Sequence, residues 1–238
     1  MPDRPYTIVS CCTSLDGYLD DGRPERLVLS NGADLDRVDG LRASCDAILV
    51  GAATVRRDNP RLLVRQPERR EERAARGLGP DPIKVTVTSC ADLDPAAAFF
   101  ACGESERLVY CSSSGATSAR RRLAGVATVV DAGQPVHMEW LVADLYARGV
   151  QRLLVEGGAR VLTQFLSAGL VDELDLAVAP FFVGDPSAHR FVGAGPFPWD
   201  ASHRADLLEV RQIEDVVLMR YALTAPGGPT SGKAPPCR

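Results

Sequence analysis

The sequence has 238 residues, 45% of them hydrophobic, and its 27 basic and 31 acidic residues give a formal net charge of −4 at pH 7. A chain of this size can bury a full core, so we expect one large domain rather than several small ones. The slight acidic excess lacks the basic surface that binding to nucleic acid requires, which argues against nucleic acid as a partner.

No apolar run is long enough to cross a membrane, and the first residues lack the charged and apolar stretches of a signal peptide. We therefore expect a cytoplasmic protein without membrane contact. Seven cysteines are scattered without a C-x-x-C pair, and only three histidines accompany them. This pattern predicts neither a metal site nor a disulfide framework.

Short segments rich in Val, Ile and Leu alternate along the chain with helix-like stretches. The pattern predicts strands at 6–13, 47–50, 84–88, 107–111, 128–130, 152–155 and 175–179. It predicts helices at 33–44, 118–123, 138–148 and 159–168, and a short helix that begins after residue 50 and ends before Pro60. Such alternation is typical of a mostly parallel sheet covered by helices.

The carboxyl-terminal part follows a different pattern. Residues 207–213 and 216–223 are two β-like runs separated by two residues, which predicts an antiparallel hairpin at one edge of the sheet. We therefore expect an α/β fold with a mixed, mostly parallel sheet in a single domain over residues 1–224. Residues 225–238 are rich in Gly and Pro and have little to bury, which predicts a disordered tail.

Two internal stretches, 65–76 and 191–199, are expected to be loops. The first carries five arginines interleaved with three glutamates, which favours a solvated helical face over an anion-binding patch. The second is rich in Gly and Pro and should be an irregular surface segment.

Two strand ends run into small residues and then into a helix. The strand at 152–155 is followed by Glu156, Gly157 and Gly158. A glycine pair at such a turn lets phosphates approach the backbone N–H groups at the helix start. The spacing alone is equally consistent with a pyrophosphate cradle and with a tight turn that binds nothing.

The strand at 47–50 likewise runs into Gly51 and two alanines, and then into the short helix. Thr54 and Asp58 lie four residues apart on one face of that helix, although two surface polar residues are the simpler interpretation of this pair alone. Two small-residue turns at strand ends would let one extended dinucleotide lie across the sheet.

The first strand ends in Ser14-Leu-Asp-Gly, where Asp16 is better explained as a turn former than as a catalytic acid. No nucleophile with a base, no paired carboxylates and no metal motif stand out elsewhere. What remains is a fold that binds a cofactor and lets that cofactor supply the chemistry.

Five motifs follow one another in a specific order: Ser14-Leu-Asp-Gly, the run from Leu41 to Leu62, Val155-Glu-Gly-Gly, Val171-Asp-Glu-Leu and Ala179-Pro. In order and spacing they resemble the RibD C-terminal family, the pyrimidine reductases of riboflavin biosynthesis. The resemblance implies a dihydrofolate-reductase-like three-layer sandwich. It also implies reduction by NADPH of the ribosylamino side chain of an aminopyrimidinone 5′-phosphate to ribitylamino, by direct hydride transfer to C1 of the ring-opened imine.

The resemblance implies residue roles as well. The cofactor would be held by Gly51, Thr54, Asp58 and Ser89, and by the turn and helix start at Gly157, Gly158, Ala159, Arg160, Val161 and Leu162. The substrate would be held by Arg26, Arg42, Leu62, Arg65 and Glu156, and arginine suits bidentate binding of phosphate. No catalytic side chain is assigned, and Thr13 and Asn31 lie near the same cleft without a role. A homodimer is implied too, with the aliphatic edge at 207–223 as its interface.

Three features depart from the bifunctional members of that family. Ser10 stands where they often carry a lysine, and Arg26 stands where a serine contributes to phosphate binding. Their zinc deaminase is missing, since no P-C-x-x-C is present. Two alternatives therefore stay open: a reductase of a pterin, folate or specialised-metabolite pyrimidine, and a non-catalytic NADPH-binding protein. Arg42, Arg65 and Glu156 favour the aminopyrimidine reductase.

Overall fold

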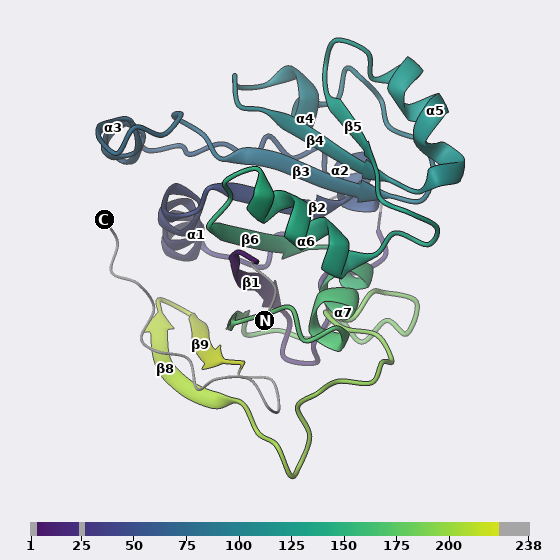
Figure 1. Ribbon diagram of the computed structural model, residues 1–238. Coiled ribbons are helices and arrows are strands. Elements are labelled where there is room, and N and C mark those ends of the chain that lie inside the picture. The colour runs from purple at the N-terminus through teal and green to yellow at the C-terminus, as the bar shows by residue number, and fades with distance from the viewer. Residues whose placement is uncertain (1–3, 24–26, 224–238) are drawn as a thin grey trace. The chain divides into compact units, whose positions relative to one another are not determined.

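Strands and helices alternate along most of the chain in the computed structural model, which describes residues 4–23 and 27–223 (Figure 1). They form two units, described in turn. Unit 1 comprises residues 6–38 and those from Val155 onward, and unit 2 comprises residues 39–154 with Arg4 and Pro5. Arg26 and the predicted disordered tail lie outside the described residues, and the single domain over 1–224 stays a prediction.

Unit 2 contains four parallel strands in the order β5-β4-β3-β2. Their bounds are β2 (Ala47–Gly51), β3 (Ile83–Thr88), β4 (Arg107–Cys111) and β5 (Thr128–Asp131). Every residue of β2 is buried, as expected for an apolar strand inside a parallel sheet. The connecting helices are α2 (Ala52–Asp58), α3 (Pro67–Ala75), α4 (Ala98–Ala101), α5 (Ser113–Arg122) and α6 (Met138–Ala147).

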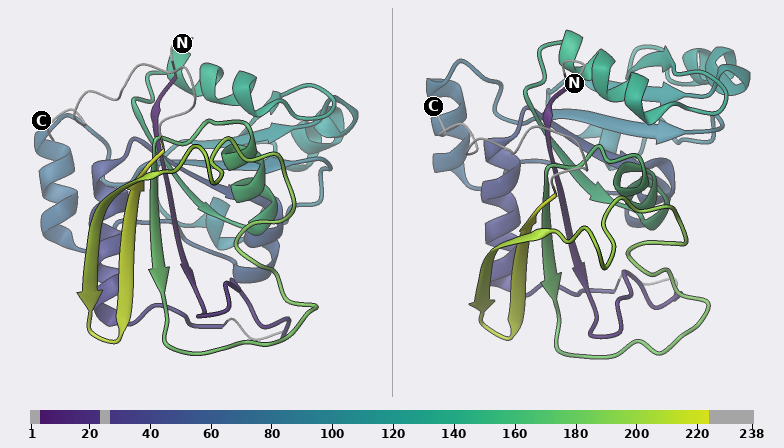
Figure 2. Two further views of the ribbon diagram at one scale, coloured as in Figure 1. Left: turned by 90° about the horizontal axis from the view of Figure 1, so that it is seen from below. Right: turned by 60° about the horizontal axis from the view of Figure 1, so that its bottom comes forward.

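Unit 1 contains strands in the order β1-β7-β9-β8, with β1 parallel to β7 and the last two pairs antiparallel. They are β1 (Tyr6–Thr13), β7 (Glu173–Val178), β9 (Val216–Ala222) and β8 (Asp206–Ile213), and Figure 2 shows the yellow hairpin beside green β7. Helix α7 (Ala159–Ser167) buries Val161, Leu162, Phe165 and Leu166, the helical stripe that the sequence predicts. Helix α1 (Gly32–Ser44) and strand β6 (Arg152–Gly157) contribute residues to both units.

The predicted α/β class, with a mostly parallel sheet and a carboxyl-terminal antiparallel hairpin, is confirmed. The irregular segment at 191–199 is also confirmed. The single-turn helix α4 was missed because four residues are too few to show a helical period.

The prediction of a loop at 65–76 is wrong, because this stretch contains α3, but the solvated helical face that its charges favoured is confirmed for most of its charged side chains, which are exposed. A proline at the first helical position favours a helix start, and good helix formers follow it. The expected solvated face is wrong for Arg73, which is only 2% exposed. Its guanidinium donates to the carbonyls of Ala43, Cys45 and Gly79 at 2.6–2.9 Å, so it closes the end of α1 and is not available to a ligand.

Within the described ranges, no helix is both long enough and apolar enough to cross a membrane.

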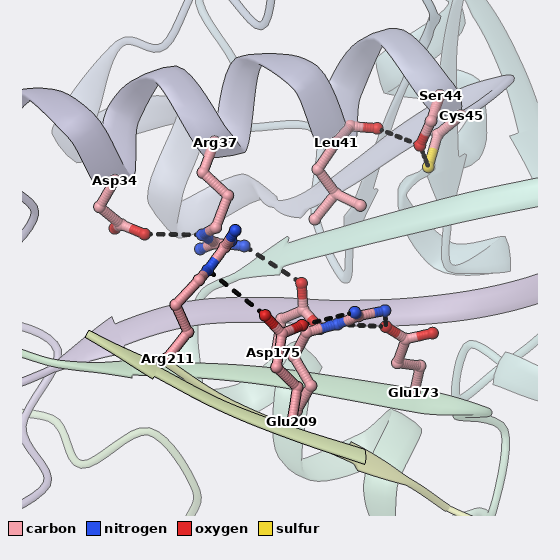
Figure 3. Close-up of polar contacts among 10 residues, drawn as sticks. Asp34, Arg37, Leu41, Ser44, Cys45, Glu173, Asp175, Glu209 and Arg211 are labelled. Carbon is pink, nitrogen blue, oxygen red and sulfur yellow. Dashed lines mark hydrogen bonds and ion pairs between the residues drawn. The ribbon is translucent and has the colours of Figure 1, made fainter. Parts of the chain in front are cut away.

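A network of charged side chains covers one face of β7 and β9 in unit 1 (Figure 3). Arg37 binds Asp34 at 2.8 Å and Asp175 at 3.1 Å. Arg220 also binds Asp175, at 3.2 Å, and it pairs with Glu173 as well. Burial, and then the charge of Glu173, raise the pKa of Asp175 from its usual 3.8 to about 6, although both arginines act in the opposite direction.

Replacing Asp175 with asparagine is expected to flatten the dependence of stability on pH. A carboxyl group with a raised pKa in the folded state stabilises the fold below about pH 4, and this contribution is lost as the pH rises through about 6. The amide has no such titration, so the free energy of unfolding of Asp175→Asn should fall less than that of the parent between pH 4 and 7. Chemical denaturation across this range measures it, with exposed Asp206→Asn as the control. A steeper fall in Asp175→Asn than in the parent would contradict the assignment.

Candidate cofactor and substrate site

The carboxyl ends of β2, β3 and β4 meet at one edge of the parallel sheet in unit 2. Gly51 ends β2 opposite Val87 of β3, and Ser89 follows two residues later with an exposed side chain. Ser112, the first residue after β4, donates from Oγ to the carbonyl of Ser89 at 2.6 Å. Ligands of parallel α/β sheets bind outside the carboxyl ends of the strands, so this edge is suited to a cofactor.

Helix α2 begins directly after β2. Gly51 has an extended conformation at its amino-terminal cap, and Asn59 ends the helix in the left-handed region at φ +43°. The short helix that ends before Pro60 is therefore confirmed. Thr54 and Asp58 are half-buried and four residues apart on it, as the spacing predicts.

Three serines after β4 were missed by the sequence analysis. The hydroxyls of Ser112 and Ser114 lie 3.1 Å apart, and the N–H of Ser114 donates to Gln134 Oε1 at 3.1 Å. Ser113 donates from Oγ to Asp131 at 2.7 Å, which lowers the pKa of that carboxyl group. Small residues between a strand and a helix were the signal at the two other turns, and three serines in succession give the same signal here.

The predicted substrate residues Arg42, Leu62 and Arg65 lie together in unit 2. Leu62 is 2% exposed and has a left-handed backbone at φ +50°, so its side chain belongs to the core. The side chain of Arg65 is exposed. Arg42 lies in the last turn of α1, and its Nη1 approaches the carbonyl of Leu63 at 3.4 Å. Arg42 thus contacts the segment that carries the other two residues.

In unit 1, β6 ends in the predicted glycine turn. Glu156 is half-buried, Gly157 has φ +134° and is joined to Gly158 by a cis peptide bond, and Gly158 is the amino-terminal cap of α7. Gly158 has no side chain with which to cap this helix, and a Cβ added at Gly157 would meet nothing within 4 Å. The open turn and the backbone N–H groups at the helix start behind it fit a pyrophosphate.

Side chains at the start of α7 differ in what they can offer to a ligand. Arg160 is exposed, whereas Val161 is 5% exposed and Leu162 is fully buried. These two apolar residues would therefore reach a cofactor only through their backbone. Gly51, Thr54, Asp58 and Ser89 belong to unit 2 and residues 156–162 belong to unit 1, so their binding of one dinucleotide stays a prediction.

The turn at the end of β1 is held by Asp16. Its carboxylate accepts hydrogen bonds from Ser14 Oγ at 2.6 Å and from the N–H groups of Val183 and Gly184. These bonds, that from Ser14 first, lower the pKa of Asp16 to about 2. A carboxylate engaged in this way anchors a loop, so the interpretation of Asp16 as a turn former is confirmed.

Asn31, which received no role, has a structural one. Its Oδ1 accepts the N–H of Asp34 at the start of α1, and its Nδ2 donates to the carbonyl of Ile213 at 2.7 Å. A groove of about 410 Å³ lies beside this contact and contains none of the predicted site residues. It is lined by Ala33, Asp36, Arg37, Arg211, Gln212, Ile213 and Glu214.

The sequence matches the model of the RibD C-terminal domain over residues 5–219. It is 38% identical over 182 residues to the 2,5-diamino-6-ribosylamino-4(3H)-pyrimidinone 5′-phosphate reductase of Archaeoglobus fulgidus. This match covers 76% of the present chain and 83% of that protein. The protein of the same name from Methanothermobacter thermautotrophicus is 34% identical over 222 residues, 92% of this chain and 99% of that protein.

Among solved structures, Acinetobacter baumannii RibD is similar with a TM-score of 0.76 and 25% identity. The similarity covers 93% of this chain but 59% of that chain, so the present chain spans about three fifths of that longer protein.

Proposed function

Because the chain belongs to the RibD C-terminal domain family, we propose that it reduces the ribosylamino side chain of 2,5-diamino-6-ribosylamino-4(3H)-pyrimidinone 5′-phosphate to ribitylamino in riboflavin biosynthesis, with NADPH as the reductant. The observation that carries this proposal is the identity of 38% and 34% to two reductases named for that substrate, one of them matched over 99% of its length.

The cofactor is assigned to the two strand-to-helix turns. The open turn at Gly157 and Gly158 and the first N–H groups of α7 would bind the pyrophosphate, because a helix start attracts negative charge. Thr54 and Asp58 of α2 and Ser89 after β3 would bind the rest of the dinucleotide. When bound, the nicotinamide supplies the hydride, and the chain supplies the orientation.

The substrate is assigned to Arg42, Arg65 and Glu156. Two arginines tied to one segment suit bidentate binding of the 5′-phosphate, and the carboxylate of Glu156 can accept hydrogen bonds from the amino groups of the pyrimidinone. No side chain is assigned as the proton donor, so positioning carries most of the expected acceleration.

The test is to follow the loss of reduced-nicotinamide absorbance with purified protein, NADPH and each candidate substrate. The proposal is supported if NADPH is oxidised in the presence of the ribosylaminopyrimidinone phosphate and is oxidised much more slowly with the dephosphorylated form of that substrate. Turnover with dihydrofolate alone would favour a folate or pterin reductase instead. Tight NADPH binding without any turnover would favour a non-catalytic binding protein. The same assay with NADH in place of NADPH tests which of the two nicotinamide cofactors the protein uses.

We also propose a homodimer that forms through β8, the last strand of the sheet order in unit 1. Leu207, Leu208 and Val210 on this edge are 52–60% exposed. An unpaired edge with exposed aliphatic side chains favours pairing with another strand. Antiparallel pairing of two copies about Val210 would place Glu209 of each copy opposite Arg211 of the other, a favourable cross-strand pair.

Replacing Val210 with aspartate is expected to shift the protein from dimer to monomer, because two like charges would meet at the two-fold axis. Sedimentation velocity over a range of concentrations measures this. Val28 is the matched control, since it is an exposed valine of the same unit and Val28→Asp should leave the mass unchanged. A dimer of unchanged stability in Val210→Asp would place the interface elsewhere.

A further inference from the structure

We propose that two buried carboxylates, Asp39 and Asp81, are positioning residues. They fix the backbone of the 62–66 segment, and through it they hold Arg65 where it presents its guanidinium to the substrate phosphate. The inference rests on the proposed function, in which Arg65 binds that phosphate. It adds residues that no sequence motif pointed to.

The 62–66 segment lies between α2 and α3 and forms no helix or strand. Three consecutive backbone N–H groups of this segment nevertheless donate hydrogen bonds to carboxylate oxygens. Val64 donates to Asp81 Oδ1 at 2.8 Å. Arg65 donates to Asp39 Oδ1 at 2.6 Å, and Gln66 donates to Asp39 Oδ2 at 3.3 Å. Two side chains from outside the segment thus hold three consecutive backbone groups.

Both carboxylates come from well-packed parts of unit 2. Asp39 is 3% exposed and lies on α1, and Asp81 is 4% exposed and lies two residues before β3. Arg69 of α3 binds Asp39 Oδ2 at 2.9 Å and so balances its charge. Burial of a carboxylate is unfavourable unless hydrogen bonds satisfy it, and bonds from N–H groups to an ionised oxygen are stronger than neutral ones. The segment is therefore held firmly although it is irregular.

This arrangement holds the backbone of Arg65 and leaves its side chain exposed. The amino-terminal end of the segment is anchored by the buried side chain of Leu62. Arg42, the second arginine assigned to the phosphate, contacts the carbonyl of Leu63 in the same segment. Arg65 therefore belongs to a fixed segment of backbone, and Arg42 contacts the same segment. Bidentate binding of phosphate requires guanidinium groups that are held in place in this way.

Asp46 provides a matched control. Its Oδ2 accepts the N–H groups of Gln151 at 2.9 Å and Arg152 at 2.8 Å, also in unit 2. This is the same chemistry, one carboxylate bound to two consecutive backbone N–H groups, at a place with no predicted substrate residue. Removal of the Asp46 carboxylate therefore shows the general effect of losing hydrogen bonds between a carboxylate and two backbone N–H groups.

The experiment compares Asp39→Asn with Asp46→Asn by amide hydrogen exchange and by steady-state kinetics. An asparagine keeps one acceptor oxygen but turns an N–H group toward the backbone donors. We expect faster exchange of residues 62–66 in Asp39→Asn, a rise in KM for the phosphorylated substrate of about tenfold, and a change in KM for NADPH of less than about twofold. Asp46→Asn should change neither the exchange of this segment nor either KM. In an Arg65→Ala background, Asp39→Asn should add less than about twofold, because it acts through Arg65.

Unchanged exchange of the segment in Asp39→Asn would overturn the inference, whatever the kinetics. Faster exchange with an unchanged KM would also overturn it, because the held backbone would not matter for the substrate. If Arg65→Ala itself leaves the KM unchanged, the phosphate role in the proposed function fails, and the inference fails with it. Should Asp39→Asn not fold, Asp81→Asn tests the same expectations through the N–H of Val64.

Discussion

Arg65→Ala is expected to lower kcat/KM for the phosphorylated substrate by about 10- to 100-fold, since hydrogen bonds to a charged group contribute about 1.5–3 kcal/mol and about 1.4 kcal/mol corresponds to a factor of ten. The side chain is exposed, so its removal should leave the fold intact. Steady-state kinetics with the phosphorylated and the dephosphorylated substrate measures the effect. The loss should be confined to the phosphorylated form, and the KM for NADPH should not change.

Arg76 is the matched control for Arg65, because it is an exposed arginine of the same unit at the end of α3. Arg76→Ala should keep the kinetics of the parent protein. Arg65→Lys should recover part of the loss, since lysine keeps the charge but not the bidentate geometry. Equal losses for substrate and cofactor in Arg65→Ala would contradict a phosphate role.

Gly157→Val is expected to destabilise the fold and to abolish binding of NADPH. At φ +134° a β-branched residue is strained by roughly 1–3 kcal/mol, even though the space beside Gly157 is open. In a chain of this size the strain should lower the Tm by roughly 5 °C. Relief of the strain would also move the turn that leads into α7, and fluorescence titration with NADPH would report the loss of affinity.

Gly32 separates backbone strain from the general effect of replacing a glycine. It lies at the start of α1 in unit 1, has no positive φ, and an added Cβ would meet nothing within 4 Å. Gly32→Ala should change stability by less than about 0.5 kcal/mol and leave NADPH affinity unchanged. If Gly157→Val bound NADPH as tightly as the parent protein, the glycine turn would not be the cofactor site.

Local patterns were sufficient for most of the elements. The apolar runs at β1 and β4 predicted both strands to the residue, and the stripe of Val161, Leu162, Phe165 and Leu166 predicted the buried face of α7. Such patterns work because neighbours in sequence share one face of a helix or alternate across a strand. The two small-residue turns were predicted for the same reason.

Contacts between residues distant in sequence could not be predicted in this way. The charge balance of 65–76 suggested a solvated face, but Arg73 closes the end of α1 about 30 residues earlier in the chain. The sequence predicted no role for Asp39 or Asp81. A single aspartate in a helix or a loop gives no local indication of which backbone N–H groups it will bind. Only folding brings those carboxylates to the N–H groups of Val64, Arg65 and Gln66.

The sequence by itself determined the α/β class, the order of the strands along the chain, the family and the two turns with small residues, because each depends on side-chain size and spacing over a few neighbours. The tertiary structure decided which charged side chains serve the fold and which stay exposed for a ligand. Arg73 is buried and donates to carbonyls, whereas the Arg65 side chain is exposed and only its backbone N–H binds a buried carboxylate, although both lie in one arginine-rich stretch. Burial and long-range hydrogen bonds make that distinction, and neither is encoded in local spacing.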